Sequence, residues 1–282
     1  MSSLNAELPI GVFDSGVGGL TVLNALRRRL PSENLIYLGD TARVPYGTKS
    51  SVSIVKYAEQ AAAALIERDI KLLVVACNTA SAVAIEPLQN LYPKLQVMGV
   101  VGPGAEASCK QSRSGRIGII ATESTVRNNA YQNAILNLVP DASVTAQSCS
   151  LFVALAEEGW HSGELVERIV SECLDPLKVK GVDQLDTLVL GCTHFPALKG
   201  AIANVMGDDV VLVDSAETTA NSVERSLLET NLLNQQESHG VVEFLVTDGP
   251  ERFARVATNF YDEKIGLPEI QMVDIQHFSV PG

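Results

Sequence analysis

One pattern occurs twice in this sequence and limits what the chain can fold into. The apolar run over residues 72–76 leads into Cys77-Asn78-Thr79, and the apolar run over residues 188–191 leads into Cys192-Thr193-His194. Short apolar runs that end in small polar residues are typical of fully buried strands that turn into helices. Because the two cysteines are far apart in the sequence, each belongs to its own strand–turn–helix unit.

The remainder of the chain alternates in the same way. A helix is well supported from residue 50 onward, because Val52, Val55, Ala58 and Ala62 fall on one face. Strands are predicted at residues 9–13, 34–40, 72–76, 96–101, 116–121, 141–147, 188–191, 209–214 and 241–246. Helices are predicted at residues 20–30, 50–66, 78–89, 151–158, 163–178 and 216–229, and from Pro250 onward. This alternation predicts an α/β protein with doubly wound, mostly parallel sheets.

The length of the chain and an internal echo favour two similar domains. At 282 residues the chain is long for a single core. The run Ile117-Gly118-Ile119-Ile120 repeats the opening Ile10-Gly11-Val12-Phe13, just as Cys192 repeats Cys77. These echoes predict a duplicated unit, with the two domains related by pseudo-symmetry. The stretch Gly102-Pro103-Gly104 is the expected crossing point between them.

The carboxyl ends of the predicted strands indicate where a ligand binds. In open parallel sheets, ligands bind at the carboxyl ends of the strands. Asp14-Ser15, Cys77, Thr122 and Cys192 each follow a predicted strand. All four segments are therefore expected to line one cleft.

The net charge and the cysteines indicate which kinds of partner and which cellular compartment to expect. A net charge of −12 argues against a nucleic-acid partner, because phosphate binding needs clustered Lys and Arg. Neither a signal peptide nor an apolar run of the ~18 residues that a membrane helix needs is visible, so no membrane partner is expected. The five scattered cysteines contain no Cys-x-x-Cys pair. Reduced thiols in a cytoplasmic protein are therefore the interpretation we prefer.

Cys77 and Cys192 differ from the other three cysteines in their context. Each is expected at a helix N-terminus, where the free amides and the helix dipole lower a thiol pKa from its usual ~8.5. Asp14 is expected to approach Cys77, and His194 lies in the same turn as Cys192. Each thiol would then have its own proton partner. Cys109, Cys149 and Cys173 are interpreted as inert, buried residues.

The glycine-rich stretch after the first strand offers a weaker alternative. Gly16-Val17-Gly18-Gly19 before a helix, with Asp40 ending the next strand, is similar to a dinucleotide-binding fingerprint. However, Thr21 occupies the third glycine position, and Asp14 places an anion just ahead of the loop that would hold pyrophosphate. A nucleotide-binding regulatory protein remains as the non-enzyme alternative. The sequence contains neither a phosphate-binding P-loop nor Cys/His metal spacing.

Four motifs together resemble the bacterial glutamate racemases of the Asp/Glu racemase family. They are Asp14-Ser15-Gly16-Val17-Gly18-Gly19, Val44-Pro45-Tyr46-Gly47, Ala76-Cys77-Asn78-Thr79-Ala80 and Gly191-Cys192-Thr193-His194-Phe195-Pro196. The resemblance implies a cofactor-independent racemase that supplies D-glutamate for peptidoglycan. It also implies a first domain of residues 1–99 with 213–282, a second of residues 100–212, and an active site in the cleft between them.

The resemblance assigns roles to individual residues. It implies that Cys77 abstracts the proton from D-glutamate and Cys192 from L-glutamate, aided by Asp14 and His194 respectively. Thr122 lies in a segment similar to a substrate loop of the family, in which Ser124 replaces an expected glycine; the roles of Thr125 and Glu157 stay open. Implied substrate contacts are Asp14, Ser15, Tyr46, Gly47, Asn78, Thr79, Thr122, Thr193 and His194.

Other functions remain compatible with the sequence. An aspartate racemase or a broad-specificity amino-acid racemase would share the two thiols. An enzyme that uses pyridoxal phosphate would need a Schiff-base lysine, for which Lys49 and Lys71 are candidates. The chain could also act as a homodimer, since the sequence does not fix the oligomeric state.

Overall fold

The computed structural model describes residues 5–178 and 184–278. Within these residues the strands form two separate sheets, and all neighbouring strands run parallel. The first sheet contains β1 (Ile10–Asp14), β2 (Leu35–Gly39), β3 (Leu72–Val75), β4 (Gln96–Gly99), β9 (Val242–Val246) and β10 (Ile270–Met272). The second contains β5 (Arg116–Ala121), β6 (Ser143–Ser148), β7 (Thr187–Gly191) and β8 (Val211–Asp214).

The four strands of the second sheet are arranged in the same order as β2, β1, β3 and β4 of the first sheet. The first sheet runs β10-β9-β2-β1-β3-β4, and the second runs β6-β5-β7-β8. In each, the first strand along the chain lies between the second and the third, and the fourth lies beside the third. This arrangement makes β1 equivalent to β5, and β3 equivalent to β7. The predicted architecture of two similar, doubly wound parallel sheets is confirmed.

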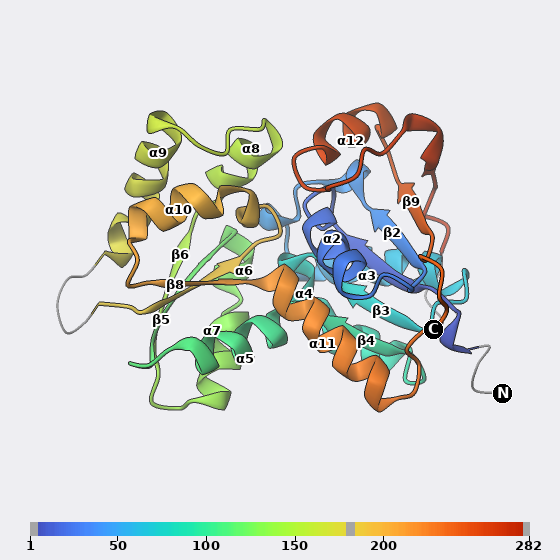
Figure 1. The fold of residues 1–282 in the computed structure, drawn as a ribbon, viewed down its shortest axis with the longest axis horizontal. Coiled ribbons are helices and arrows are strands. Elements are labelled where there is room, and N and C mark those ends of the chain that lie inside the picture. Colours follow the sequence, from blue (N-terminus) through green and yellow to red (C-terminus); the bar gives the residue numbers. More distant parts are fainter. Residues whose placement is uncertain (1–4, 179–183, 279–282) are drawn as a thin grey trace.

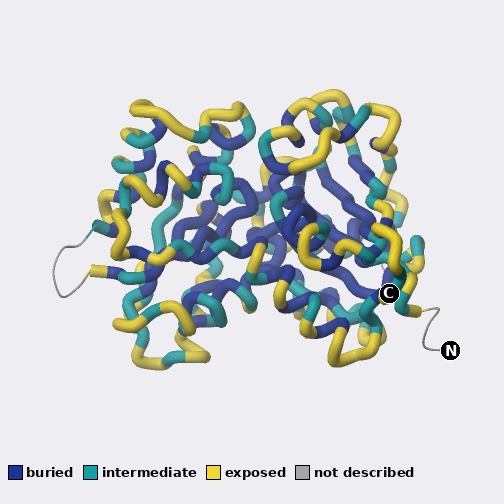
Figure 2. Tube along the Cα trace, viewed as in Figure 1, coloured by how far each residue is buried: buried dark blue, intermediate teal, exposed yellow. Residues whose placement is uncertain are grey.

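Helices cover both faces of the first sheet. α2 (Leu20–Arg29), α11 (Ser215–Glu229) and α12 (Pro250–Ala257) pack on one face, where residues such as Val12 and Tyr37 are buried. α3 (Ser51–Ile66) and α4 (Asn78–Leu91) pack on the other, against Phe13 and Leu73. Complete burial of such side chains contributes about 1.5–3 kcal/mol each. Figure 2 shows the result as a buried centre beneath exposed helices and loops.

The second sheet is covered in the same manner. α8 (Leu151–Glu157), α9 (Glu164–Leu174) and α10 (Lys199–Met206) pack on one face. α5 (Val101–Gln111) and α7 (Ala130–Leu138) pack on the other. Figure 1 shows these two groups of helices above and below the four-stranded sheet, in a lobe beside the one that holds β1 to β4.

The structure differs from the sequence-based expectations in several segments. Residues Gly102-Pro103-Gly104, expected as a bare crossing point, form the first turn of α5, where proline is tolerated because the first helical amides need no intrahelical acceptor. The rest of α5, the short helix α6 (Glu123–Arg127), α7 and the edge strand β10 were not predicted. The helix expected after Cys192 is α10, which begins only at Lys199. α9 ends at Leu174, and the 3-10 helix Asp175–Leu177 follows it.

The connection between the two lobes bears on the expected domain division. α11 contacts both α2 of the first lobe and α5 of the second. The predicted boundary between residues 212 and 213 falls inside β8, which belongs to the second sheet through Asp214. The division into residues 1–99 with 213–282 and residues 100–212 stays a prediction.

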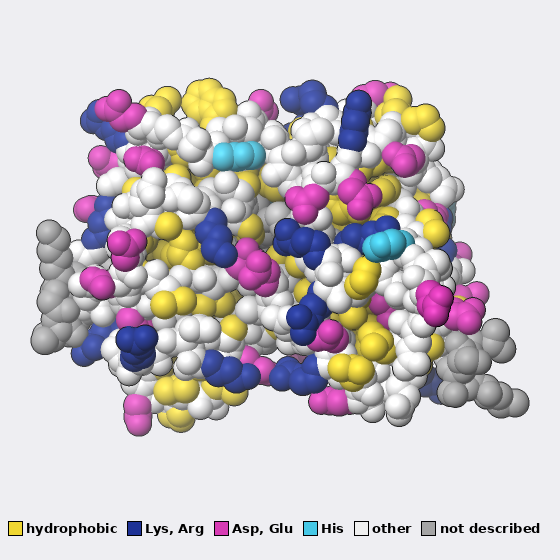
Figure 3. All heavy atoms as spheres, viewed as in Figure 1, with side chains coloured by type: hydrophobic (Ala, Val, Ile, Leu, Met, Phe, Trp, Pro, Cys, Tyr) yellow, Lys and Arg dark blue, Asp and Glu magenta, His cyan; other side chains and the backbone are white. Residues whose placement is uncertain are grey.

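Two surface properties complete the description. Lys and Arg side chains are interspersed with Asp and Glu side chains over the face of the molecule seen in Figure 3. Among the described residues, none of the helices combines the length and apolar character that crossing a membrane requires.

Candidate active site

A pocket of about 390 Å³ lies where segments that follow strands of both sheets meet. Ser15 follows β1, Cys77 follows β3, Thr122 follows β5 and Cys192 follows β7, so the carboxyl ends of four strands point at one space. The volume lies within the ~300–1,000 Å³ of typical ligand pockets. The other lining residues are Gly16, Val44, Pro45, Tyr46, Gly47, Thr48, Asn78, Thr79, Ser150, Val153, Ala154, Glu157, Thr193, His194 and Arg252.

Cys77 forms the wall of the pocket on the side of the first sheet. It is the N-cap residue of α4, and its thiol donates to Ser15 Oγ at 3.4 Å. Burial raises the pKa of Cys77 to about 12, and the charge of Asp14 adds to the increase. Ser15 and the Ala80 amide at the start of the helix oppose this effect but do not overcome it. The expectation of a lowered thiol pKa is therefore wrong for Cys77, because desolvation outweighs the helix N-terminus.

Cys192 forms the wall on the side of the second sheet, and its surroundings differ from those of Cys77. After β7 the chain makes a turn, and the 3-10 helix Phe195–Leu198 precedes α10. Cys192 was expected at a helix N-terminus, but it is not the N-cap residue of either helix. Its Sγ lies 3.8 Å from Nδ1 of His194. The Nε2 atom of the same ring lies 3.1 Å from Oε1 of Glu157.

His194 carries a proton at neutral pH in this arrangement. Burial lowers the pKa of His194, but hydrogen bonds with Cys192 and Glu157 outweigh it and raise this pKa to about 10. Burial raises the pKa of the Glu157 carboxyl, whereas His194 and Arg252 lower it further than burial raises it. An imidazolium held by a carboxylate on one side and facing a sulfur on the other can stabilise a thiolate at Cys192.

Asp14 lies behind the pocket rather than in its lining. Its carboxylate is completely buried, accepts the Gly16 amide at 2.9 Å through Oδ2, and leaves Oδ1 without a hydrogen bond from the described residues. Burial raises the pKa of Asp14, opposed by the positive charge of His194 and by loop amides. The geometry thus places Asp14 where its charge acts on Cys77 and not at the pocket surface.

The glycine-rich loop after β1 has a packing role in this structure. A Cβ atom on Gly18 would lie 2.4 Å from the His194 ring, and one on Gly19 would lie 2.4 Å from Cβ of Asp14. The Thr21 hydroxyl donates to the Thr193 carbonyl at 3.0 Å, which joins this loop to the one after β7. Because the Gly16 amide already serves Asp14, the loop is occupied by the protein's own anion rather than open to a pyrophosphate.

Tyr46 is held in place from outside the pocket. Its hydroxyl donates to Oδ2 of Asp40, which also accepts Nε of Arg43 at 2.6 Å. Oδ1 of Asp40 accepts the Thr247 hydroxyl at 3.0 Å. The Asp40 carboxylate, which the fingerprint alternative assigned to a ribose, is thus occupied by three protein donors. Gly47 follows Tyr46 and approaches Thr122 closely, since a Cβ atom there would lie 3.0 Å from Cβ of Thr122.

Three threonine hydroxyls form a closed triangle at the pocket. Oγ1 of Thr79 lies 3.0 Å from that of Thr122 and 3.2 Å from that of Thr125, and the last two are 3.1 Å apart. Thr79 belongs to α4, whereas Thr122 and Thr125 belong to the segment after β5. Thr125 therefore supports two lining residues without lining the pocket itself.

In the Asn78 side-chain amide, the oxygen is hydrogen-bonded, whereas the nitrogen has no partner among the described residues. Its Oδ1 accepts the hydroxyl of Tyr131, a fully buried residue of α7, at 2.7 Å. Its Nδ2 has no partner among the described residues. A buried amide nitrogen without an acceptor in a pocket wall is suited to donate to a bound ligand.

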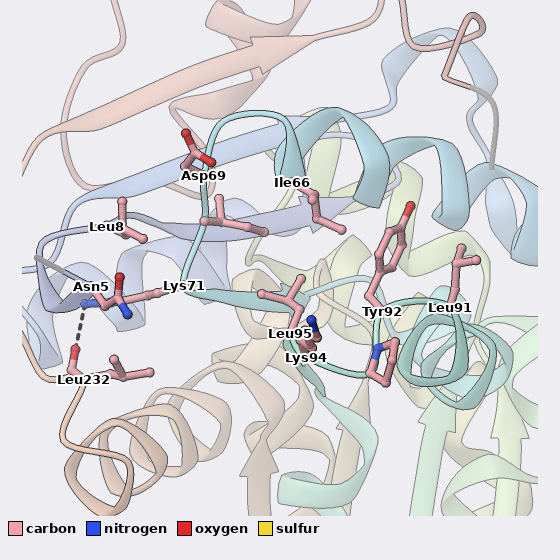
Figure 4. Close-up of a pocket in the computed structure, with 12 residues that line it drawn as sticks. Asn5, Leu8, Ile66, Asp69, Lys71, Leu91, Tyr92, Lys94, Leu95 and Leu232 are labelled. Atoms are coloured by element: carbon pink, nitrogen blue, oxygen red, sulfur yellow. Dashed lines mark hydrogen bonds between the residues drawn. The ribbon is translucent and has the colours of Figure 1, made fainter. Parts of the chain in front are cut away.

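A second cavity, of about 610 Å³, lies away from these groups (Figure 4). Its residue Lys71 immediately precedes β3, so this cavity lies at the amino end of the strand. The Lys71 ammonium donates to Glu33, to the Ala6 carbonyl and to the Leu232 carbonyl, the last at 2.9 Å. These three bonds use all of its hydrogens. Lys49 does not line the active-site pocket either, so neither candidate Schiff-base lysine is positioned for that chemistry.

The structure thus brings together most of the residues that the sequence singled out. Every residue predicted to be catalytic or to contact substrate lines the pocket except Asp14, which lies directly behind it. Glu157, left open in the sequence, contacts His194. Arg252 and Tyr131 were missed, because an exposed arginine on a helix and a lone tyrosine in an unpredicted helix carry no motif.

Comparisons with known proteins agree with this geometry. A family model described as Asp/Glu/Hydantoin racemase matches residues 18–223 of the chain. The glutamate racemase of Geobacter metallireducens is 49% identical over 257 residues, which cover 91% of this chain and 94% of that protein.

Solved structures give the same result. The crystal structure of glutamate racemase from Francisella tularensis in complex with D-glutamate matches with a TM-score of 0.89 at 37% identity, covering 97% of this chain and 100% of that one. Glutamate racemase from Thermus thermophilus in complex with Beta-chloro-D-alanine matches with a TM-score of 0.86 at 40% identity, covering 97% and 99%.

Proposed function

This chain belongs to the Asp/Glu/Hydantoin racemase family, and we propose that it is a cofactor-independent glutamate racemase that supplies D-glutamate for peptidoglycan synthesis. The observation that carries the proposal is the pair of thiols in one pocket, Cys77 from the segment after β3 and Cys192 from the segment after β7. The relatives named glutamate racemase support the choice of substrate.

Inversion of an α-carbon requires one group on each side of the carbon. A proton that is removed and returned on the same face restores the original enantiomer. A thiolate on one face and a thiol on the other satisfy the requirement. The different surroundings of the two cysteines suit this division, because Cys77 is held as a neutral thiol and Cys192 faces a protonated imidazole.

For L-glutamate the reaction runs from Cys192 to Cys77. The Cys192 thiolate, paired with the His194 imidazolium, removes the α-proton, and the Cys77 thiol delivers a proton to the opposite face. The Ser15 hydroxyl and the charge of Asp14 assist at Cys77. For D-glutamate the direction reverses. Cys77 must then begin as the thiolate and Cys192 as the protonated thiol.

The carbanionic intermediate needs preorganised hydrogen-bond donors. Candidates are the free Asn78 amide, the amides at the start of α4, and the hydroxyls of Ser15, Thr79 and Thr193. One such donor typically contributes about 3 kcal/mol to transition-state stabilisation. We assign substrate contacts to Ser15, Tyr46, Gly47, Asn78, Thr79, Thr122, Thr193 and His194, with Asp14 acting from behind the lining.

The two thiols are tested with Cys77→Ser and Cys192→Ser in deuterated water. Each variant is expected to lose racemisation, because one face has no competent base or acid. Exchange of the α-proton with solvent is expected to persist only for the enantiomer that faces the remaining thiol. Circular dichroism follows racemisation, and proton NMR follows exchange.

Cys109→Ser is the matched control, because Cys109 lies on α5 outside the pocket lining, and it should racemise like the wild type. Full racemisation by either single variant of the pocket thiols contradicts the two-base mechanism. The same assay with aspartate tests the alternative substrate, since an aspartate or broad-specificity racemase would use the same thiols.

The proposal extends to the setting of the enzyme. We place the active site between the domains of residues 1–99 with 213–282 and residues 100–212. Reduced thiols as catalytic groups favour a cytoplasmic location. The partner is a small amino acid, with no role for nucleic acid or membrane, and a homodimer is compatible with this activity.

A further inference from the structure

The Glu157 carboxylate divides its two oxygens between two cations. Oε1 lies 3.1 Å from Nε2 of His194, and Oε2 accepts from Arg252 at 2.6 Å. A carboxylate that binds a different donor through each oxygen cannot rotate without losing one of them. Arg252 therefore fixes the direction in which Oε1 points toward His194.

Arg252 approaches this carboxylate from the other lobe. Glu157 ends α8, which covers the second sheet, whereas Arg252 lies on α12, which covers the first. Asn259, just beyond α12, donates to the Glu157 carbonyl at 3.1 Å and ties the same two segments together. Backbone and side chain of Glu157 are thus both held by the α12 segment.

The contact continues inward to one of the two thiols. With Nε2 directed at Glu157, the His194 ring presents Nδ1 to Sγ of Cys192 at 3.8 Å. Cys77 has no place in this chain of contacts, because its hydrogen-bond partner is Ser15 on the other wall. Through hydrogen bonds, a disturbance at Arg252 therefore reaches Cys192 and not Cys77.

We propose that Arg252 is a positioning residue that acts through Glu157 and His194 and sets the rate of proton transfer at Cys192 but not at Cys77. The inference rests on the racemase function proposed above. Without Arg252 the Glu157 carboxylate can turn toward solvent, and His194 loses the acceptor that aligns it. Proton transfer at Cys192 then slows while proton transfer at Cys77 continues as before.

The test compares Arg252→Gln with the wild type, using L- and D-glutamate deuterated at the α-carbon. We expect kcat/KM to fall roughly ten- to a hundredfold, since general acid–base assistance contributes about 10²–10⁴-fold. The fall must be equal in both directions, because enantiomers have equal free energies. The isotope effects separate the two thiols: the effect on kcat/KM should increase with deuterated L-glutamate and decrease with deuterated D-glutamate.

Two further variants make the result specific. Arg252→Lys keeps a cation near Glu157 and should recover part of the rate and of the wild-type isotope effects. Arg255→Gln removes an exposed arginine from the same helix and should match the wild type.

The outcomes separate this inference from the function on which it rests. If wild-type protein racemises glutamate but Arg252→Gln changes both isotope effects alike, or raises KM alone, Arg252 binds substrate or supports the fold, and the inference is overturned. If the wild-type protein does not racemise glutamate, the proposed function itself has failed.

Discussion

Tyr131 is the residue that determines how Asn78 faces the pocket. Its hydroxyl donates to Oδ1 of Asn78 at 2.7 Å, and this bond leaves the amide nitrogen free in the pocket wall. If the amide turned over, its nitrogen would face the tyrosine and its oxygen would face a substrate carboxylate. One buried hydroxyl therefore selects the orientation that can donate to an anionic amino acid.

Tyr131→Phe tests this selection with the loss of one oxygen atom. We expect KM for glutamate to rise about tenfold, because a misoriented donor forfeits about 1–1.5 kcal/mol of binding. We expect kcat to change less. The measurement is steady-state racemisation in both directions. Tyr92→Phe, at the distant cavity, is the control, and an unchanged KM for Tyr131→Phe would show that Asn78 needs no such partner.

His194 gives the stability of the protein a dependence on pH. Its pKa is raised from 6.5 to about 10 in the folded state, so its contribution is complete below about pH 6.5 and is lost as pH rises toward 10. The expected loss is at most about 1.4 kcal/mol per pH unit within that window.

Denaturant unfolding at several pH values between 7 and 9 measures this slope. His194→Asn should unfold with a shallower dependence on pH than the wild type, whereas His239→Asn, at an exposed position, should run parallel to the wild type. Identical slopes for His194→Asn and the wild type would mean that this imidazole does not gain its proton on folding.

For single residues, the sequence predicted which side chains lie at the pocket better than it predicted their pKa values. Cys77 and Cys192 were found from their strand-ending motifs, yet the thiol pKa of Cys77 is raised rather than lowered. Depth of burial causes the difference, and depth follows from packing that a local motif does not contain. For the same reason the sequence did not show that Asp14 lies behind the lining, and its contact with substrate stays a prediction.

The loop between β1 and α2 shows how an element is shaped by its neighbour in the other lobe. The absence of side chains at Gly18 and Gly19 lets the His194 ring and the Asp14 side chain occupy that space. The sequence showed the glycines clearly, but their spacing was similar to a nucleotide fingerprint. The neighbours of Gly18, which are Thr193 and His194, come from a distant position in the chain that no local pattern can identify.

Gly18→Ala tests this close approach. The new methyl group would lie 2.4 Å from the His194 ring, so the loop after β7 must move. A catalytic group displaced by ~1 Å can cost about 10²-fold in rate. We therefore expect kcat/KM to fall by at least about tenfold, while the protein remains folded by circular dichroism.

Gly102→Ala is the matched control, because no atom of the described residues lies within 4 Å of the Cβ atom it would add in α5. It should retain full activity and gain up to about 1 kcal/mol of stability from its better helix propensity. Wild-type kinetics for Gly18→Ala would mean that the two loops do not need to meet this closely during catalysis.

Most elements of the two sheets were predictable, because fully buried parallel strands leave continuous apolar runs in the sequence. The missed segments include two helices of ordinary length, α5 and α7, and two short elements. β10 has only the residues Ile270–Met272, and α6 only Glu123–Arg127. Elements of this length depend on tertiary contacts more than on their own periodicity.

At the scale of the whole molecule, a buried ion pair ties distant parts of the chain to the first sheet. The Lys71 ammonium binds the Glu33 carboxylate, and both side chains are 1% exposed. Glu33 also accepts the Asn234 amide at 2.8 Å, and Lys71 reaches the carbonyls of Ala6 and Leu232. The pair thereby joins the N-terminal segment, the start of β3 and the connection between α11 and β9.

Lys71→Met is expected to destabilise the protein by about 3–5 kcal/mol, because Glu33 would remain buried without its cation. The double variant Glu33→Gln/Lys71→Met should recover part of that loss. Denaturant unfolding measures both, and Lys94→Met, an exposed lysine at the rim of the same cavity, is the control. A loss below about 1 kcal/mol for Lys71→Met would place this pair with weak surface ion pairs.

The repeated strand order has a geometric limit that bears on the chemistry. A copied sheet is superposed on its original by rotation, and rotation can bring a second sulfur to the far side of a carbon atom. A rotation does not convert a chiral arrangement into its mirror image. The second half therefore cannot also hold the other substituents of the α-carbon in mirror-image positions. On the mechanism proposed above, the two halves should therefore differ around their sulfurs, and they do: Ser15 lies beside Cys77 and His194 lies beside Cys192.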